Sequence, residues 1–170
     1  MSDGSMTLRG RVRAVLGNNI DTDVIYPGRY LNVTDREKTP EHLFELVYPE
    51  IRAALQPGDI IVATKNFGGG SSREQAAAAL KFAGVGAVIA ASFGRIFFRN
   101  AINLGLPAVV SLDAAGACAV GDELEVDLTG GEIRNVTQNR VIAAAALDPR
   151  AVELLVAGGL IPYLKRKYAA

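Results

Sequence analysis

A glycine-rich turn followed by two serines and an arginine is the part of this sequence best suited to chemistry. It spans residues 66–75 and reads Asn-Phe-Gly-Gly-Gly-Ser-Ser-Arg-Glu-Gln. An apolar run at 59–64 precedes it and predicts a buried strand, and an alanine-rich stretch with helical spacing follows at 76–83. The motif is therefore expected at the carboxyl end of a strand, where open α/β sheets bind their ligands.

These residue types favour the binding of an anion. The unpaired N–H groups of a first helical turn and the helix dipole attract a carboxylate or an oxyanion. Arg73 adds a planar guanidinium that can hold a carboxylate by two hydrogen bonds. A Walker loop is excluded because the Gly-Lys-Ser/Thr sequence is missing, and a dinucleotide fingerprint because Arg73 stands where its third glycine belongs.

Helix capping is the structural alternative for the two serines. Ser71 with Glu74, and Ser72 with Gln75, both fit the capping-box spacing, so one serine is expected to cap the helix. One helix needs only one cap, which leaves the other serine for chemistry. The neighbouring glycines let a ligand approach the backbone.

Composition limits the classes of function. The 170 residues predict one domain, spanning 1–170, and 49% hydrophobic residues suffice for a core. Eighteen basic residues balance eighteen acidic ones, so we expect neither nucleic acid nor a membrane surface as the main partner. The sequence lacks the apolar run of a membrane helix and the start of a signal peptide, which predicts a cytoplasmic protein.

A single cysteine and a single histidine exclude an internal disulfide and an ordinary Cys/His metal site. Any metal must come with another chain. Cys118 lies among small residues and is expected to be a buried hydrophobic residue. His42 is expected in the first turn of a helix that Thr39 caps and Pro40 begins.

The order of predicted elements indicates an α/β fold with a parallel-sheet βαβαβ core. Residues 8–16 alternate apolar and basic side chains, as in a half-buried strand. The core comprises strands at 60–64, 87–91 and 107–110 and helices at 73–83 and 95–104.

An exposed loop is expected at 30–40, before this core. After the core we predict strands at 122–128 and 141–146 around a turn at Gly130-Gly131, and then helices at 151–156 and 160–166.

Five segments, taken in order, resemble the small subunit of 3-isopropylmalate dehydratase, the free-standing form of the aconitase swivelling domain. They are Asp21-Thr22-Asp23, Tyr30-Leu31, the motif at 66–75, the segment 91–100 and Gly158-Gly159-Leu160. The resemblance runs over nearly the whole chain. It implies the aconitase-type swivelling β/β/α domain and a hydro-lyase of leucine biosynthesis, which interconverts 2-isopropylmalate and 3-isopropylmalate by dehydration and rehydration.

The resemblance also implies roles for individual residues. In this superfamily a 4Fe-4S cluster on the large subunit holds the substrate, while a serine of the swivelling domain removes a proton from the neighbouring carbon. That serine corresponds to Ser71, whose alkoxide Arg73 and first-turn N–H groups could stabilise. Ser72 and Arg73 would contact a substrate carboxylate, and Asp23 would orient neighbours or pass on the proton. Further candidates, for ligand contact or for loop stabilisation, are Asn66, Arg95 and Asn100.

By the same resemblance, no cofactor binds this chain alone. The expected partners are a cluster-binding large subunit and a small dicarboxylate substrate, and the isolated chain is expected to be inactive, with a homo-oligomer as one open state. Many relatives carry cysteine in place of Gly69 and histidine in place of Gln75. Neither position holds the cluster or the base.

The loop after Tyr30 is expected, from the resemblance, to face the variable arm of the malate substrate. Members that take a third carboxylate tend to place an arginine here, whereas this chain has Asn32-Val33 after Leu31. Burying a carboxylate without a partner is costly, so an isopropyl or other short alkyl arm is favoured.

Two alternatives stay open. Arg29 and Arg36 are close enough in sequence to swing toward the arm, which keeps homoaconitate and other alkyl-malates as possible substrates. A non-catalytic, anion-binding regulatory module is the alternative of another class. Such a module would need only the backbone of the glycine loop, whereas the dehydratase needs the Ser71 hydroxyl.

Overall fold

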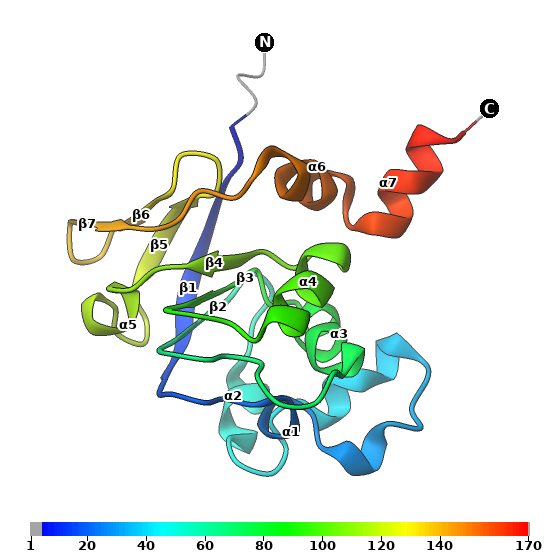
Figure 1. Cartoon of the computed structure of the whole chain (residues 1–170). Coiled ribbons are helices and arrows are strands. Elements are labelled where there is room, and N and C mark those ends of the chain that lie inside the picture. The colour runs from blue at the N-terminus through cyan, green and yellow to red at the C-terminus, as the bar shows by residue number, and fades with distance from the viewer. Residues whose placement is uncertain (1–4, 170) are drawn as a thin grey trace.

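One long strand, β1 (Thr7–Leu16), joins two differently built halves of the sheet. Its second half pairs in parallel with β2 (Ile60–Ala63), and its first half pairs antiparallel with β5 (Glu123–Asp127). Figure 1 shows β1 running through the molecule between these halves. The end of β1 therefore lies beside the end of β2, which brings the segment after residue 16 close to the glycine loop.

The computed structural model describes residues 5–169. Residues 1–4 and residue 170 lie outside the described residues. The prediction about a signal peptide depends in part on the first four. Within residues 5–169 the strands form one sheet of seven, in the order β4-β3-β2-β1-β5-β6-β7. The remaining strands are β3 (Ala87–Ala90), β4 (Ala108–Val110), β6 (Glu132–Asn135) and β7 (Arg140–Ala143).

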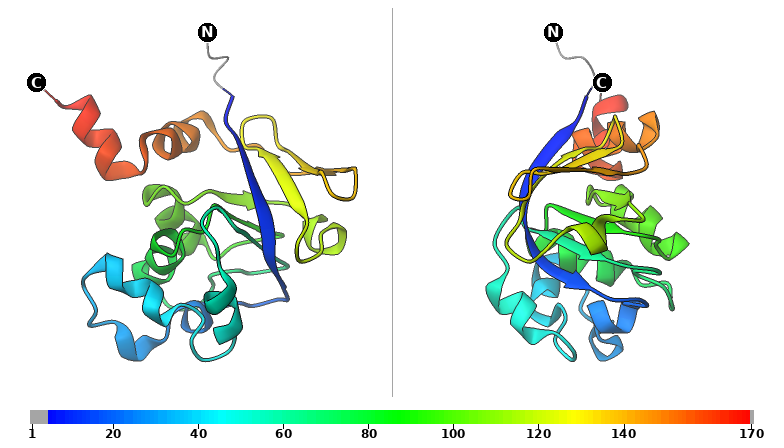
Figure 2. Two further views of the ribbon diagram at one scale, coloured as in Figure 1. Left: turned by 180° about the vertical axis from the view of Figure 1, so that it is seen from behind. Right: turned by 90° about the vertical axis from the view of Figure 1, so that its left-hand side faces the viewer.

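Helices cover both faces of the parallel strands. Figure 2 shows α3 (Glu74–Phe82) and α4 (Arg95–Asn103) on one side of these strands and α2 (Pro49–Ala54) on the other. Strands β2 and β3 are buried along their whole length, as parallel strands between two helical layers should be. The four alanines at 76–79 are buried in α3, and their small side chains allow the helix to lie close to the sheet.

Shorter helices connect these units, and two helices end the chain. They are α1 (Thr22–Ile25), η1 (Gly28–Tyr30), η2 (Arg36–His42), α5 (Ala114–Ala117), α6 (Pro149–Ala157) and α7 (Leu160–Lys167). Helix α6 packs against α4, and α7 projects beyond the sheet (Figures 1 and 2). No helix of the described residues has both the length and the apolar character needed to cross a membrane.

The predicted βαβαβ core and the two C-terminal helices are confirmed, with small differences at their ends. Strand β6 was not predicted, because its sequence Glu-Ile-Arg-Asn is mostly polar and only Ile133 and Asn135 are buried. The turn at Gly130-Gly131 therefore leads into β6, and a second turn leads into β7.

The predicted cap at Thr39 is wrong. Asp35 caps η2 by accepting a hydrogen bond from the Glu37 N–H at 3.0 Å. Pro40 lies inside η2 and His42 in its last turn, because a 3₁₀ helix already begins at residue 36. Residues 36–40 of the expected loop thus belong to a short 3₁₀ helix.

A buried carboxylate fixes the turn before β5. One oxygen of Asp122 accepts hydrogen bonds from the Asn135 amide at 2.8 Å, the Ala119 N–H at 2.8 Å and the Gln138 amide at 2.6 Å. The bond from Asn135 is the largest of the effects that lower the pKa of Asp122, because each donor favours the charged form. Cys118 lies nearby and is half-buried rather than fully buried, and burial raises the pKa of its thiol.

We expect Asp122→Asn to lower the free energy of unfolding by about 1 kcal/mol at pH 7, since an amide oxygen accepts weaker hydrogen bonds than a carboxylate. A carboxyl whose pKa is lowered by folding stabilises the protein above its unfolded pKa of about 3.9, and this contribution disappears as pH falls through the folded pKa. Denaturant unfolding at pH 7 and at decreasing pH measures the free energy of unfolding of the parent and of Asp122→Asn. The difference in free energy between the two proteins should shrink below about pH 4. A difference that stays constant with pH would contradict the assignment. Asp113→Asn, which changes an exposed carboxylate, is the control.

Candidate active site

The glycine loop leaves the sheet at the end of β2 and lies beside the loop that follows β3. Phe67 and Phe93 form a parallel bridge between the two loops. Gly94 permits this approach, because a Cβ atom there would lie 2.5 Å from the carbonyl oxygen of Gly68. Gly68 itself has φ 80°, a left-handed conformation that side chains rarely adopt. Both loops therefore meet at the carboxyl edge of the parallel strands, where α/β sheets bind ligands.

Thr22, in the segment that follows β1, clamps the glycine loop. Its N–H donates to the Gly69 carbonyl at 3.0 Å, and its hydroxyl donates to the Ser71 carbonyl at 3.0 Å. Thr22 is buried, and Asp21 caps α1 by accepting from the Val24 N–H at 2.9 Å. The backbone of Ser71 is thereby fixed while its side chain is exposed.

The start of α3 corrects the capping prediction. The helix begins at Glu74 with Arg73 at the N-cap position, and no side chain of the described residues caps it. The chain is still extended at Arg73, with φ −129° and ψ 107°, so Ser71 and Ser72 lie too early to reach the first-turn N–H groups. Both serines are exposed. These hydroxyls and the first turn of α3 can therefore serve a ligand.

Arg73 and Asp23 form an ion pair across the loop. The Arg73 side chain is 14% exposed and the Asp23 side chain 60% exposed, so the cation is largely enclosed and the carboxylate faces solvent. Gly28 borders this pair. A Cβ atom at Gly28 would lie 3.1 and 3.2 Å from the two terminal guanidinium nitrogens and 3.2 Å from an Asp23 oxygen. Gly28 thus leaves room for the guanidinium.

A cleft of about 500 Å³ opens beside Ser71. The glycine loop and Asn66 form part of its wall, and Arg95 and Arg99 of α4 form another part. The two arginines are one helical turn apart, so they project from the same face of α4. Both are exposed, and neither takes part in an ion pair within residues 5–169. The cleft therefore presents positive charge next to the exposed serine.

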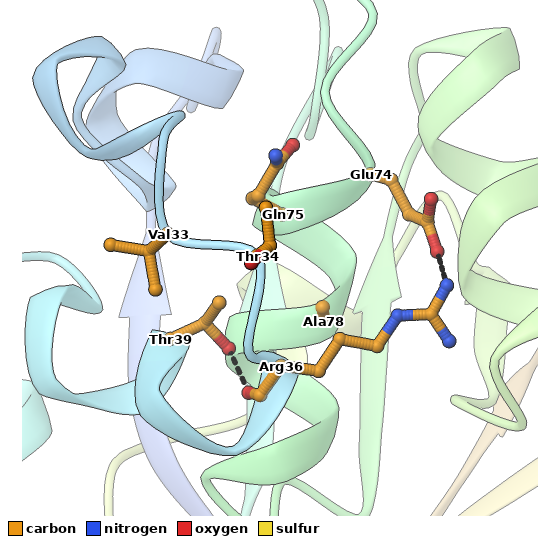
Figure 3. Close-up of a pocket in the computed structure, with 7 residues that line it drawn as sticks. All are labelled: Val33, Thr34, Arg36, Thr39, Glu74, Gln75 and Ala78. Atoms are coloured by element: carbon orange, nitrogen blue, oxygen red, sulfur yellow. Dashed lines mark hydrogen bonds and ion pairs between the residues drawn. The ribbon is translucent and has the colours of Figure 1, made fainter.

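A second pocket, of about 210 Å³, adjoins the start of α3. Figure 3 shows Val33 on one side of it and the ion pair between Arg36 and Glu74 on the other. The Gln75 side chain also lines the pocket, and its amide lies 3.4 Å from the Leu31 carbonyl, which it can reach as a donor. The loop predicted to face the substrate arm is thus connected to the helix that follows the serines.

The Tyr30 side chain is engaged within the chain. Its ring stacks on His42 with 3.5 Å between the ring centroids, and its hydroxyl donates to Glu45 at 3.2 Å. Arg29 also pairs with Glu45, at 3.3 Å. The hydrogen bond from Tyr30 is the largest of the effects on Glu45, whose pKa is lowered. By contrast, Leu31 and the following Asn32 are exposed, and Val33 is partly buried.

Among residues 5–169, no group of three or more histidine, cysteine, aspartate or glutamate side chains is arranged to hold a metal ion.

Residues 6–112 match the profile of the aconitase C-terminal domain. The chain belongs to the aconitase C-terminal domain family. Over 162 residues it is 50% identical to the 3-isopropylmalate dehydratase small subunit of Moorella thermoacetica, covering 95% of this chain and 97% of that protein. It is 49% identical over 162 residues to the isopropylmalate/citramalate isomerase small subunit of Methanocaldococcus jannaschii, covering 95% and 96%.

A solved structure agrees with this membership. The crystal structure described as 3-isopropylmalate dehydratase (leuD) from Methanocaldococcus jannaschii superposes with a TM-score of 0.86 at 42% identity, covering 95% of each chain. The resemblance seen in the sequence and the predicted swivelling-domain fold are therefore confirmed.

In this aconitase C-terminal domain the predicted site residues do not all meet. Asn100 lines a separate hollow with Asn103 and Leu160, away from the Ser71 cleft. Arg99 was missed, although its spacing of one turn from Arg95 could have identified it.

Thr22 lies in the segment Asp21-Thr22-Asp23, but the sequence predicts no role for it. Its function depends on a hydrogen bond to a residue 49 positions away, which no local pattern reveals. Asn66 donates to the Asn19 side chain at 3.0 Å, which stabilises the loop. It also lines the cleft, and contact with a ligand stays a prediction.

We expect Gly28→Ala to displace the Arg73 guanidinium, because the new methyl group would lie 3.1–3.2 Å from its nitrogens. The resonance of the Arg73 side-chain N–H in an NMR spectrum should shift, and the free energy of unfolding should fall by about 1 kcal/mol or less. Gly17→Ala is the matched control, since a Cβ atom there meets nothing within 4 Å. An unchanged Arg73 resonance would show that Gly28 does not make this room.

Proposed function

We propose that this chain is the small subunit of a 3-isopropylmalate dehydratase, a hydro-lyase of leucine biosynthesis, and that Ser71 is its base. The observation that carries the assignment of the base is the exposed Ser71 side chain at a positively charged cleft, on a backbone that Thr22 holds in place. Identity to proteins named as small subunits of this enzyme supports the reaction. The expected cytoplasmic location remains a prediction.

In the proposed reaction, Ser71 takes a proton from the carbon next to the one that bears the hydroxyl group. The C–H electron pair forms a carbon–carbon double bond as the C–O bond breaks, and the departing hydroxyl group takes up a proton from solvent and leaves as water. Addition of water with the two carbons exchanged then gives the isomer. A serine hydroxyl is a weak base, so its alkoxide needs nearby positive charge. Arg73, Arg95, Arg99 and the N-terminus of α3 can provide it.

Arg73 is also placed to bind a substrate carboxylate. One of its terminal nitrogens contacts Asp23, which leaves the other donors of the guanidinium for a ligand. Ser72 lies next to it and is exposed. We infer that Asp23 keeps Arg73 oriented and, being mostly exposed, exchanges the proton with solvent.

The site needs a second chain to be complete. The polar side chains at the cleft are serine, arginine and asparagine, which suit an anionic substrate, whereas iron–sulfur clusters are held by cysteine thiolates. A 4Fe-4S cluster would therefore belong to a large subunit and would supply the Lewis acid that withdraws the substrate hydroxyl. We infer that this partner covers the Ser71 cleft and that the chain alone is inactive.

An alkyl arm is the proposed choice because Val33 lines the pocket beside α3. The alternatives are homoaconitate and other alkyl-malates. Citramalate is one of these, because the name of one relative includes it. A non-catalytic anion-binding module would keep its ligand when the Ser71 hydroxyl is removed, which distinguishes it from the enzyme.

We expect Ser71→Ala, assayed with the large subunit, to lower kcat by about a thousandfold or more, because it removes the proposed base. The free energy of unfolding should stay unchanged, since Ser71 is exposed and does not cap α3. Ser72→Ala should raise KM more than it lowers kcat and should also leave stability unchanged. Cys118→Ser is the control with parental activity. Turnover of the Ser71 variant within about tenfold of the parent would defeat the assignment.

Val33→Arg should shift the ratio of specificity constants toward malates with a third carboxylate, by about 1–3 kcal/mol relative to 3-isopropylmalate. The new cation would lack a partner with an alkyl arm and gain one with a carboxylated arm. Kinetics with both substrates measure the shift. Val47→Arg places the same side chain at an exposed valine outside the pocket and should leave the ratio as it is. A ratio that does not respond to Val33→Arg would mean that this loop does not contact the arm.

A further inference from the structure

We propose that Arg36 is a specificity-determining residue whose charge is withheld from the substrate arm by Glu74. This inference rests on the proposed function, because it concerns the pocket assigned to the arm. In the structure Arg36 is the one cation and Glu74 the one anion among the described residues that line this pocket. They are paired with each other, so the pocket carries no net charge.

The position of Arg36 would otherwise suit the recognition of a carboxylate. Its backbone is anchored in η2, where its carbonyl accepts a hydrogen bond from the Thr39 hydroxyl at 2.6 Å. Its side chain is 49% exposed and therefore free to reorient about this fixed point. An arginine that lines a pocket binds a carboxylate by paired hydrogen bonds when no other carboxylate occupies it. Here Glu74 occupies it.

The direction of the Arg36 side chain shows which way Glu74 draws it. Figure 3 shows the side chain extending past Ala78 to Glu74, on the side of the pocket opposite Val33. The same pair also borders a separate hollow, lined by Asn103 and Ile161 among others. The guanidinium thus lies between two hollows, and the apolar wall at Val33 and Ala78 is left to a neutral arm.

The second arginine near this loop is restrained in the same way. Arg29 pairs with Glu45 at 3.3 Å and lies over the Tyr30 ring at 5.0 Å from its centroid. Arg29 and Arg36 are therefore both paired with a glutamate. A carboxylated arm would have to replace Glu74 at Arg36, whereas an alkyl arm requires no change of partner.

Glu74 belongs to the motif at 66–75, whereas its partner Arg36 lies outside that motif. Arg36 lies in the loop segment 38 positions earlier, so the effect of the glutamate depends on what this loop presents to it. The pairing is half-exposed on both sides, and such pairs contribute little to stability. Breaking it should therefore change specificity and leave the fold intact.

The test uses the reconstituted two-subunit enzyme and two substrates, 3-isopropylmalate and homoisocitrate, whose arm is a carboxyethyl group. Glu74→Gln should raise the ratio of kcat/KM for homoisocitrate over 3-isopropylmalate by roughly tenfold, mainly through the KM for homoisocitrate. The ratio cancels any loss of kcat common to both substrates. High salt should weaken the gain, because a charge pair produces it. Glu37→Gln removes the same charge one residue from Arg36, outside the pocket, and should leave the ratio unchanged.

The double variant Arg36→Met/Glu74→Gln decides between two causes. If Arg36 supplies the gain, the double variant returns to the parental ratio. A gain that persists without Arg36 would reflect removal of repulsion by Glu74 and would overturn the proposal, as would an unchanged ratio in Glu74→Gln. A parent enzyme without activity on 3-isopropylmalate would contradict the proposed function instead. In that case, the release of Arg36 is tested by adding homoisocitrate to the isolated Glu74→Gln chain and following the Arg36 side-chain N–H resonance in an NMR spectrum. A shift of this resonance is expected if Arg36 is released, and an unchanged resonance would refute the proposal.

Discussion

Two hydrogen bonds from Thr22 hold the glycine loop in place, and the rest of the site depends on them. The Thr22 N–H donates to the Gly69 carbonyl, and the buried Thr22 hydroxyl donates to the Ser71 carbonyl, both at 3.0 Å. They exist because β1 and β2 are parallel neighbours, which places the segment after β1 beside the turn after β2. A buried hydroxyl without its acceptor would cost more than an exposed one, so this contact restricts the loop to one arrangement.

The charges around the loop divide into paired and unpaired ones, and the division decides where an anion can bind. Arg73 is enclosed and held by Asp23, so it offers an oriented set of donors rather than a mobile charge. Arg95 and Arg99 lack carboxylate partners within residues 5–169 and raise the potential of the cleft. We propose that Arg95 and Arg99 draw an anion toward Ser71 and that Arg73 orients it.

Patterns within single segments predicted the fold, and contacts between segments largely escaped prediction. The βαβαβ core was evident because apolar runs and helical spacing change sharply at glycines. Strand β6 was missed because its stability comes from pairing with β5 and β7 rather than from its own composition. The capping box failed at Ser71 and Ser72 for a related reason: the loop is bound to Thr22, 49 positions earlier, and the chain is still extended at Arg73, so α3 starts only at Glu74.

For the same physical reason, the candidate serine was identifiable from the sequence and its surroundings were not. A surplus of serines beside three glycines is visible in the sequence, whereas the pairing of Arg36 with Glu74 joins residues 38 positions apart. The site thus has two parts with different electrostatics. Under the proposed function, the positively charged cleft would take the carboxylates common to all malates, and the pocket at Val33, which carries no net charge, would take the part in which malates differ. Because the segment 71–75 contributes to both, movement of this one segment would reshape the cleft and the pocket together, which under the proposed function couples catalysis to arm recognition.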